Sequence, residues 1–154
     1  MQVEKYKELI KQLSQTNSLK DDAPYDVCNV VVRGISFSIV QGNAGDEDSL
    51  YIYGEVGSPS VETKVNVLER LMGMNLWLYG SNNNVPAFGF DVEKNQVLIM
   101  YRMAISDTKF ESLQYVLNQF AKYIDDLRPM LFVKGSGNYS MPLSPLPDVM
   151  NALN

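Results

Sequence analysis

Two neighbouring stripes of apolar side chains run along the segment from Ser58 to Gly80, which the sequence predicts to be a helix. At about 100° of turn per residue, one stripe contains Val61, Val65, Leu68, Met72 and Leu76. The other lies about 120° around the helix axis and contains Val67, Leu71, Met74 and Leu78. A helix on the surface of a small domain needs only one apolar stripe, because only one side of it meets the core. We therefore predict a homodimer whose interface consists of Val67, Leu71, Met74, Asn75, Trp77 and Leu78.

The remaining hydrophobic patterns predict two more helices and five strands. Apolar residues recur with helical spacing in residues 3–15, and again from Ser106 or Asp107 to Pro129. Valine runs or alternation of apolar and polar residues predict strands at 27–32, 35–41, 50–54, 87–92 and 96–103. Ser58 and Pro59 are typical of the first residues of a helix, so the middle helix is expected to begin there. The order α-β-β-β-α-β-β-α predicts an α+β fold, with a twisted, mainly antiparallel sheet and helices packed on it.

Glycine and proline separate the last part of the chain from the rest. Residues 1–129 are predicted to form one domain, and Pro129 is expected to end its last helix. Residues 130–154 contain Gly135, Gly137, Pro142, Pro145 and Pro147. This composition argues against a long helix there, and we expect an extended or partly disordered tail.

The composition favours a single soluble domain and argues against several partners. The chain has 154 residues, of which 45% are hydrophobic and 20% are charged. Its net charge of −5 and the scatter of its basic residues argue against nucleic acid, because phosphate repulsion would oppose binding. No apolar run approaches the ~20 residues needed to cross a bilayer, and the charged start differs from a signal peptide. We expect a protein of the cytosol without membrane insertion.

The side chains that carry most enzymatic chemistry are missing. The sequence contains no histidine, which removes the usual activation of serine and cysteine nucleophiles and the commonest metal ligand. Cys28 is the only cysteine, and we interpret it as a small strand residue rather than a reactive thiol. Asp46, Glu47 and Asp48 lack the alternating ligands of a calcium loop, so we interpret them as part of a solvated turn. We predict no enzymatic activity, no cofactor and no metal.

Four segments resemble those of a known family, in the same order along the chain. Residues 50–57 resemble its third strand, and residues 68–76 resemble a helix with a leucine pair and an asparagine near its end. Residues 88–99 are similar to its hairpin, and residues 110–120 to its last helix. The family is the Tir-chaperone (CesT-like) family, the class I chaperones of bacterial type III secretion. The resemblance covers residues 3–128, whereas the asparagine-rich loop 81–86 and the tail depart from it.

The resemblance implies a homodimer in the bacterial cytosol that binds the N-terminal region of one or a few secreted effectors. The effector segment would be held extended and ready for the secretion apparatus, and no reaction would be catalysed. The alternative is a protein of another class, a small acidic immunity or antitoxin-like protein that blocks one folded partner.

Binding of an extended segment requires a strand edge and apolar pockets. We therefore expect a groove on the first helix and the first three strands. The candidate residues are Tyr6, Ile10, Val30, Val32, Phe37, Ile39, Tyr51 and Tyr53. Strand alternation allows only some of them to face the groove, and Tyr51 and Tyr53 share one face. Aromatic rings with a polar tip suit a surface that is wet when empty and buried when filled.

Overall fold

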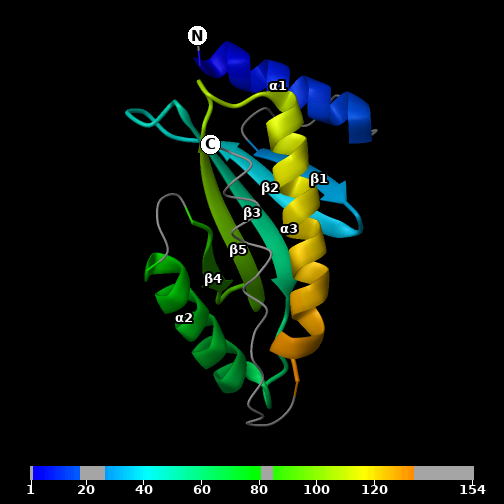
Figure 1. The fold of residues 1–154 in the computed structure, drawn as a ribbon, viewed down its shortest axis with the longest axis vertical. Helices are drawn as coiled ribbons and strands as arrows, with labels where there is room; N and C mark the ends of the chain where they lie inside the picture. The colour runs from blue at the N-terminus through cyan, green and yellow to red at the C-terminus, as the bar shows by residue number, and fades with distance from the viewer. Residues whose placement is uncertain (1, 18–26, 81–84, 134–154) are drawn as a thin grey trace.

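The structure is a computed structural model that describes residues 2–17, 27–80 and 85–133, and in that part of the chain it contains three helices and five strands (Figure 1). In chain order they are α1 (Gln2–Asn17), β1 (Val27–Val32), β2 (Ile35–Gln41), β3 (Ser49–Gly57), α2 (Lys64–Gly80), β4 (Ala87–Asp91), β5 (Gln96–Ala104) and α3 (Phe110–Leu131). The predicted order of elements and the α+β class are confirmed.

The strands form one antiparallel sheet in the order β1-β2-β3-β5-β4. β1 and β2 form a hairpin, and both residues of its turn, Arg33 and Gly34, have positive φ (52° and 79°). Two-residue turns of this kind match the right-handed twist of the strands that they join. After β3 the chain passes through α2 and β4 before β5 returns to pair with β3, placing Ile52 opposite Tyr101.

One face of the sheet is covered by α3, and α1 packs across the end of the sheet beside β1 and α3 (Figure 1). Because successive strand residues point to opposite faces, every second residue meets these helices. The strands contribute fully buried side chains such as Ile39, Ile52 and Ile99. α3 buries the apolar face predicted for it, including Leu113, Leu117, Phe120, Ile124 and Leu127.

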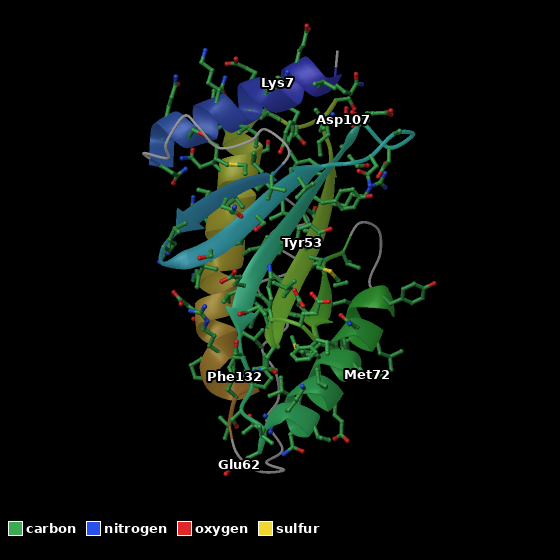
Figure 2. The ribbon with its side chains drawn as sticks, turned by 180° about the vertical axis from the view of Figure 1, so that it is seen from behind. Lys7, Tyr53, Glu62, Met72, Asp107 and Phe132 are labelled. Atoms are coloured by element: carbon green, nitrogen blue, oxygen red, sulfur yellow. The ribbon has the colours of Figure 1, made fainter. Side chains whose placement is uncertain are left out.

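The opposite face of the sheet, which we call the open face, carries partly or fully exposed side chains. They are Val27, Asn29, Val31, Ser36, Ser38, Val40, Tyr51, Tyr53, Glu55, Ala87, Gly89, Asp91, Gln96, Leu98, Met100 and Arg102. Figure 2 shows Tyr53 near the middle of the sheet in a view from the side opposite to that of Figure 1. Apolar side chains lie on both faces of β5. The chain buries only the face with Ile99 and Tyr101, and it leaves Leu98 and Met100 partly exposed.

α2 lies along the outer edge of the sheet, beside β4 (Figure 1). The Asn75 side chain donates a hydrogen bond to the Phe88 carbonyl (2.9 Å) and accepts one from the Phe88 N–H (2.7 Å). An edge strand presents backbone groups that need partners. The amide of Asn75 therefore takes the place of a neighbouring strand at this point.

Two helix boundaries differ from those predicted. α2 begins six residues after Ser58, at Lys64, because the turn at Ser60 and Thr63 precedes it. In this turn the Thr63 side chain accepts from the Ser60 N–H (3.2 Å) and the Ser60 side chain accepts from the Thr63 N–H (3.3 Å). These reciprocal bonds are those of a capping box, so Ser60, and not Ser58 as predicted, caps this helix.

α3 continues through Pro129 to Leu131, so the prediction that Pro129 ends this helix is wrong. Proline removes one backbone hydrogen bond. The last turn is nevertheless held, because Leu131 is buried and Arg70 of α2 donates to the carbonyls of Met130 (3.3 Å) and Leu131 (3.0 Å). The predicted tail from residue 134 onward lies outside the described residues.

Candidate functional site

Five of the eight residues predicted for the groove belong to the core of the chain. Their side chains are at most 5% exposed, and they are Tyr6, Ile10, Val30, Phe37 and Ile39. They lie on the face of α1, β1 and β2 that is closed by packing within the chain, and the Tyr6 hydroxyl donates to the Ile39 carbonyl (3.2 Å). Their assignment to an exposed groove is therefore wrong for this structure. The strand pattern identified the apolar face correctly, but it did not indicate which helix covers that face.

The other three predicted residues, Val32, Tyr51 and Tyr53, are partly exposed. Val32 packs at the margin of the core. Tyr51 and Tyr53 lie on the open face, where Tyr53 is opposite Ser38 on β2 and Met100 on β5. They therefore remain candidates for contact with a partner.

A hollow of about 260 Å³ lies on the open face where β3, β5 and β4 meet. Its lining residues are Tyr51, Ile52, Tyr53, Val85, Ala87, Met100, Tyr101 and Arg102. Ala87 lies opposite Met100, so a small residue stands beside a long, flexible one. Methionine adapts to differently shaped partners. The hollow could therefore accept an apolar side chain of a partner, while the polar groups of Tyr51, Tyr53 and Arg102 lie at its rim.

A hydrogen-bonded cluster holds one wall of this hollow in place. The Asp46 carboxylate accepts hydrogen bonds from Ser49, from the Tyr51 hydroxyl and from Arg102, whose Nη2 lies 2.9 Å away. These bonds lower the pKa of Asp46 to about 2, with the Ser49 bond as the largest cause. Hydrogen bonding to a carboxylate favours its charged form. The cluster fixes the direction of the Tyr51 ring and pairs the charge of Arg102.

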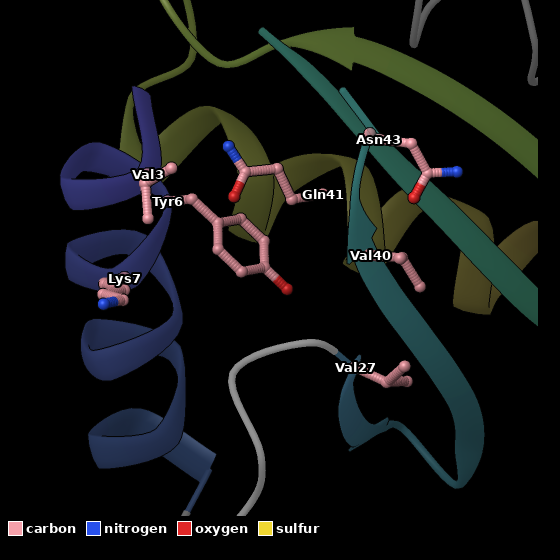
Figure 3. A pocket seen from close by; sticks show the side chains of 8 residues that line it. Val3, Tyr6, Lys7, Val27, Val40, Gln41 and Asn43 are labelled. Carbon is pink, nitrogen blue, oxygen red and sulfur yellow. The ribbon is translucent and has the colours of Figure 1, made fainter. Parts of the chain in front are cut away.

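A second cavity, of about 380 Å³, lies between the start of α1 and strands β1 and β2 (Figure 3). Its lining residues are Val3, Tyr6, Lys7, Val27, Val40, Gln41, Gly42 and Asn43. Val27 and Val40 face each other across β1 and β2. The cavity lies where α1 meets the first two strands, and Tyr6 borders it although its side chain is only 2% exposed.

The stripe of α2 that was predicted to form the dimer interface is buried within the chain, and the other stripe is exposed. Val67, Leu71, Met74 and Leu78, which we call the inner stripe, are at most 5% exposed and pack inside the chain. Asn75 is bonded to β4, so of the six residues predicted for the dimer interface only Trp77 is mostly exposed. The outer stripe is defined here as Val61, Val65, Met72 and Leu76, and its side chains are 65–94% exposed. Met72 is labelled on α2 in Figure 2.

The sequence contained signals for what the prediction missed. Asn75 interrupts the inner stripe with an amide, as expected where a helix meets a strand edge rather than a flat core. Leu98 and Met100 give β5 a second apolar face, which indicates a second cover, yet neither residue was among the predicted site residues.

The described residues contain neither a cluster of metal ligands nor a helix able to span a membrane. Within residues 2–17, 27–80 and 85–133, no three acidic or cysteine side chains come together as metal ligands. None of the described helices combines the length and the hydrophobicity needed to span a bilayer.

A family model for the Tir chaperone protein (CesT) family matches residues 7–128. The chain therefore belongs to this family. A comparison with curated protein sequences gave no match.

Solved structures share the fold at low sequence identity. A chain of the ExsC–ExsE complex superposes with a TM-score of 0.65 at 10% identity, covering 84% of this chain and 98% of that one. A chain of the ExoT–SpcS complex from Pseudomonas aeruginosa gives 0.56 at 17% identity, covering 80% and 97%. A chain of the HopA1–SchA chaperone–effector complex gives 0.57 at 15% identity, covering 81% and 94%.

Proposed function

We propose that this protein is a homodimeric type III secretion chaperone of the bacterial cytosol, which binds the N-terminal region of a secreted effector in extended form. It keeps the effector competent for secretion and catalyses no reaction. The proposal rests on one observation: although the chain has the fold of the Tir chaperone family, it leaves apolar side chains on the open face without a cover. The fold shared with a chain of a chaperone–effector complex supports it.

The effector segment would gain two kinds of contact. β1 is the end strand of the sheet, so its outer edge offers backbone groups for strand pairing. Tyr51, Tyr53 and the two cavities offer room for side chains. Ordering an extended segment loses conformational entropy, so a long segment and much apolar area are needed for useful affinity.

The dimer would form through the outer stripe of α2. Val65, Met72 and Leu76 are exposed in one chain, and Trp77 extends the patch. A patch of this kind on a soluble protein is typical of an interaction surface. A twofold arrangement of two α2 helices would bury the same residues on both copies.

The test is to express the chain together with candidate effectors and to purify the complex. We expect mass spectrometry to identify one or a few bound proteins, and limited proteolysis to leave a protected N-terminal segment without its own folded core. Protection of a compact, folded domain of the partner would instead favour the immunity or antitoxin-like function. Failure to retain any effector, with the chaperone itself folded, would refute the proposal.

A further inference from the structure

We propose that residues 134–154, which we call the C-terminal segment, dock on their own chain along the side of α2 that faces α3. This side, the α3 side of α2, consists of Asn66, Arg70, Gly73 and Trp77. Their spacing of four, three and four positions places them on one line along the helix. Trp77 lies about 100° around the axis from Leu76, so the segment and a second copy on the outer stripe can be bound at the same time.

Arg70 fixes the point at which the C-terminal segment begins. Its Nη1 donates to the carbonyl oxygens of Met130 (3.3 Å), Leu131 (3.0 Å) and Val133 (3.4 Å). Val133 is the residue before the segment, so residue 134 starts beside α2. The start of α2 and the end of α3 lie at the same end of the molecule in both views (Figures 1 and 2).

The neighbouring end of β3 is already occupied. A Cβ atom placed on Gly57 would lie 2.8 Å from the ring of Phe132. The ring of Phe132 therefore packs closely on the backbone at the end of β3. The route along α2, past the residues that follow Arg70, is left for the segment.

Gly73 and Trp77 offer the segment a place to pack. A glycine inside a helix lowers its stability relative to alanine. A Cβ atom on Gly73 would meet nothing within 4 Å, so the described part of the chain gives no packing reason for this glycine. A second segment that crosses the helix closely would give one. One turn further on, Trp77 is 70% exposed, and it is the one apolar side chain of the α3 side.

The C-terminal segment has the length and the residues to use this place. Arg70 and Trp77 are about 10 Å apart along the helix axis, a distance that about four extended residues cover. Residues 134–138 are polar or glycine, and the first apolar residues after them are Tyr139 and Met141. Tyrosine rings and methionine sulfur both make favourable contacts with aromatic rings. The structure therefore favours Tyr139 and Met141 as the partners of Trp77.

The attachment at Arg70 favours the chain's own segment over other occupants. A short tether of this kind gives an effective concentration of the order of millimolar at the nearby surface. Pro142, Pro145 and Pro147 restrict the segment before it docks, so less conformational entropy is lost. A second copy or an effector would have to displace a segment that is always present.

The first experiment measures how fast trypsin cleaves after Lys134 in the full-length protein. Lys134 is the one basic residue of the segment, so mass spectrometry can identify the released residues 135–154. A docked segment is cut only while it is undocked. Trp77→Ala should therefore raise the cleavage rate about fivefold to tenfold, because the segment loses its main partner. Leu76→Ala, which truncates a similarly exposed neighbour on the outer stripe, is the matched control and should change the rate less than about twofold.

The second experiment uses the fluorescence of Trp77, the only tryptophan of the chain. Replacing Tyr139 and Met141 with serine in the full-length protein should raise acrylamide quenching about twofold, because the ring loses a covering side chain. The control replaces Val149 and Leu153 with serine. It removes two apolar side chains from the same segment but beyond the reach of α2, so quenching should stay as in the wild type.

Three results would overturn the inference. Equal cleavage of the wild type and Trp77→Ala, with circular dichroism showing both folded, would mean that the segment does not use this ring. Equal acceleration by Leu76→Ala and Trp77→Ala, with a shift of the monomer–dimer equilibrium, would assign Trp77 to a second copy. Protection of Trp77 from acrylamide that appears only with a co-expressed effector bound would assign it to the effector.

Discussion

The two apolar stripes of α2 are similar in composition and differ in environment. Each contains valine, leucine and methionine, yet the inner stripe is at most 5% exposed and the outer stripe is 65–94% exposed. Hydrophobicity alone predicts that both stripes are covered in the working protein. The inner stripe is covered by the chain itself, whereas the outer stripe is open in a single chain. The same substitution made once in each stripe should therefore distinguish an effect on the stability of the fold from an effect on dimer formation.

The largest difference is expected between Leu71→Asp and Leu76→Asp. Leu71→Asp buries an unpaired charge in the core, which should cost about 4 kcal/mol or more and leave the chain unfolded or insoluble. Leu76→Asp places the same charge on the outer stripe, so the fold should persist while the proposed dimer dissociates. Circular dichroism and sedimentation velocity measure the two effects. A folded monomer for Leu71→Asp together with an intact dimer for Leu76→Asp would restore the interface predicted from the sequence.

A milder version compares Met74→Ala with Met72→Ala. Loss of the buried Met74 side chain should lower the free energy of unfolding by about 2–5 kcal/mol, because it leaves a cavity. Met72 is 73% exposed, so its truncation should change the stability of the monomer by less than about 0.5 kcal/mol. Urea titrations at a protein concentration that keeps both variants monomeric provide the measurement. Equal losses at both positions would contradict the division into two stripes.

Asn75 lies on the inner side of the same helix and tests how α2 is held to β4. Asn75→Ala would leave the N–H and the carbonyl of Phe88 without their partner, at a cost of about 1–3 kcal/mol. Hydrogen exchange of the Phe88 amide should accelerate more than that of amides in β2. Asn75→Asp keeps an acceptor for the N–H but loses the donor, so it should not restore full stability. An unchanged Phe88 amide would mean that the edge is protected by other contacts.

The two faces of the sheet allow the same test, because Tyr51 and Tyr53 lie on the open face and Ile52 lies on the covered face. Replacing both with alanine should preserve the fold, because the two rings lie on the open face, and should weaken effector binding by about 1–2 kcal/mol. Calorimetric titration with the effector identified by co-purification provides the measurement. As the control on the covered face, Ile52→Ala should lower stability instead, since Ile52 is 1% exposed. Full effector binding by the double variant would remove the open face from the site.

The smallest effect is expected at Tyr123, on the covered side of the sheet. Its side chain is 1% exposed, and its hydroxyl has no hydrogen-bond partner among the described residues. Burial raises the pKa of this hydroxyl, which favours its neutral form. Tyr123→Phe should leave stability unchanged or raise it by up to about 1 kcal/mol, because an unsatisfied polar group is removed. A clear loss of stability in a thermal melt would show that the hydroxyl has a partner in the assembled protein.

Patterns with a strong period were predictable, and boundaries held by distant contacts were not. The alternation in β2 and the helical spacing in α3 each predicted one apolar face, and the structure buries these faces, with Ile35, Leu117 and Phe120 among the buried residues. The end of α3 was missed because it depends on Arg70, which is 60 positions away from Met130 in the chain. The start of α2 was missed because Ser58 and Ser60 are both suitable caps, and only Ser60 forms reciprocal bonds with Thr63.

The candidate site was less predictable than the fold. Tyr6 and Phe37 were assigned to a groove because they are apolar, yet they are buried with 2% and 1% of their surface exposed. An aromatic residue on an amphipathic element meets either a core or a partner, and the sequence pattern is the same in both cases. Tyr51 and Tyr53 remained candidates because they share a strand with Leu50 and Ile52, which point to the opposite face.

The sequence by itself determined the order of the elements, the apolar faces of each and membership of a family that is recognised along residues 7–128. These properties are local or additive, because periodicity and composition are carried by neighbouring residues. Only the tertiary structure decided which apolar face meets the chain's own core, which is left exposed, and where Arg70 and Asn75 find their partners. Those choices depend on the direction from which α2 and α3 approach the sheet. The hydrophobic effect has no direction of its own, so the pattern of apolar residues cannot specify that approach.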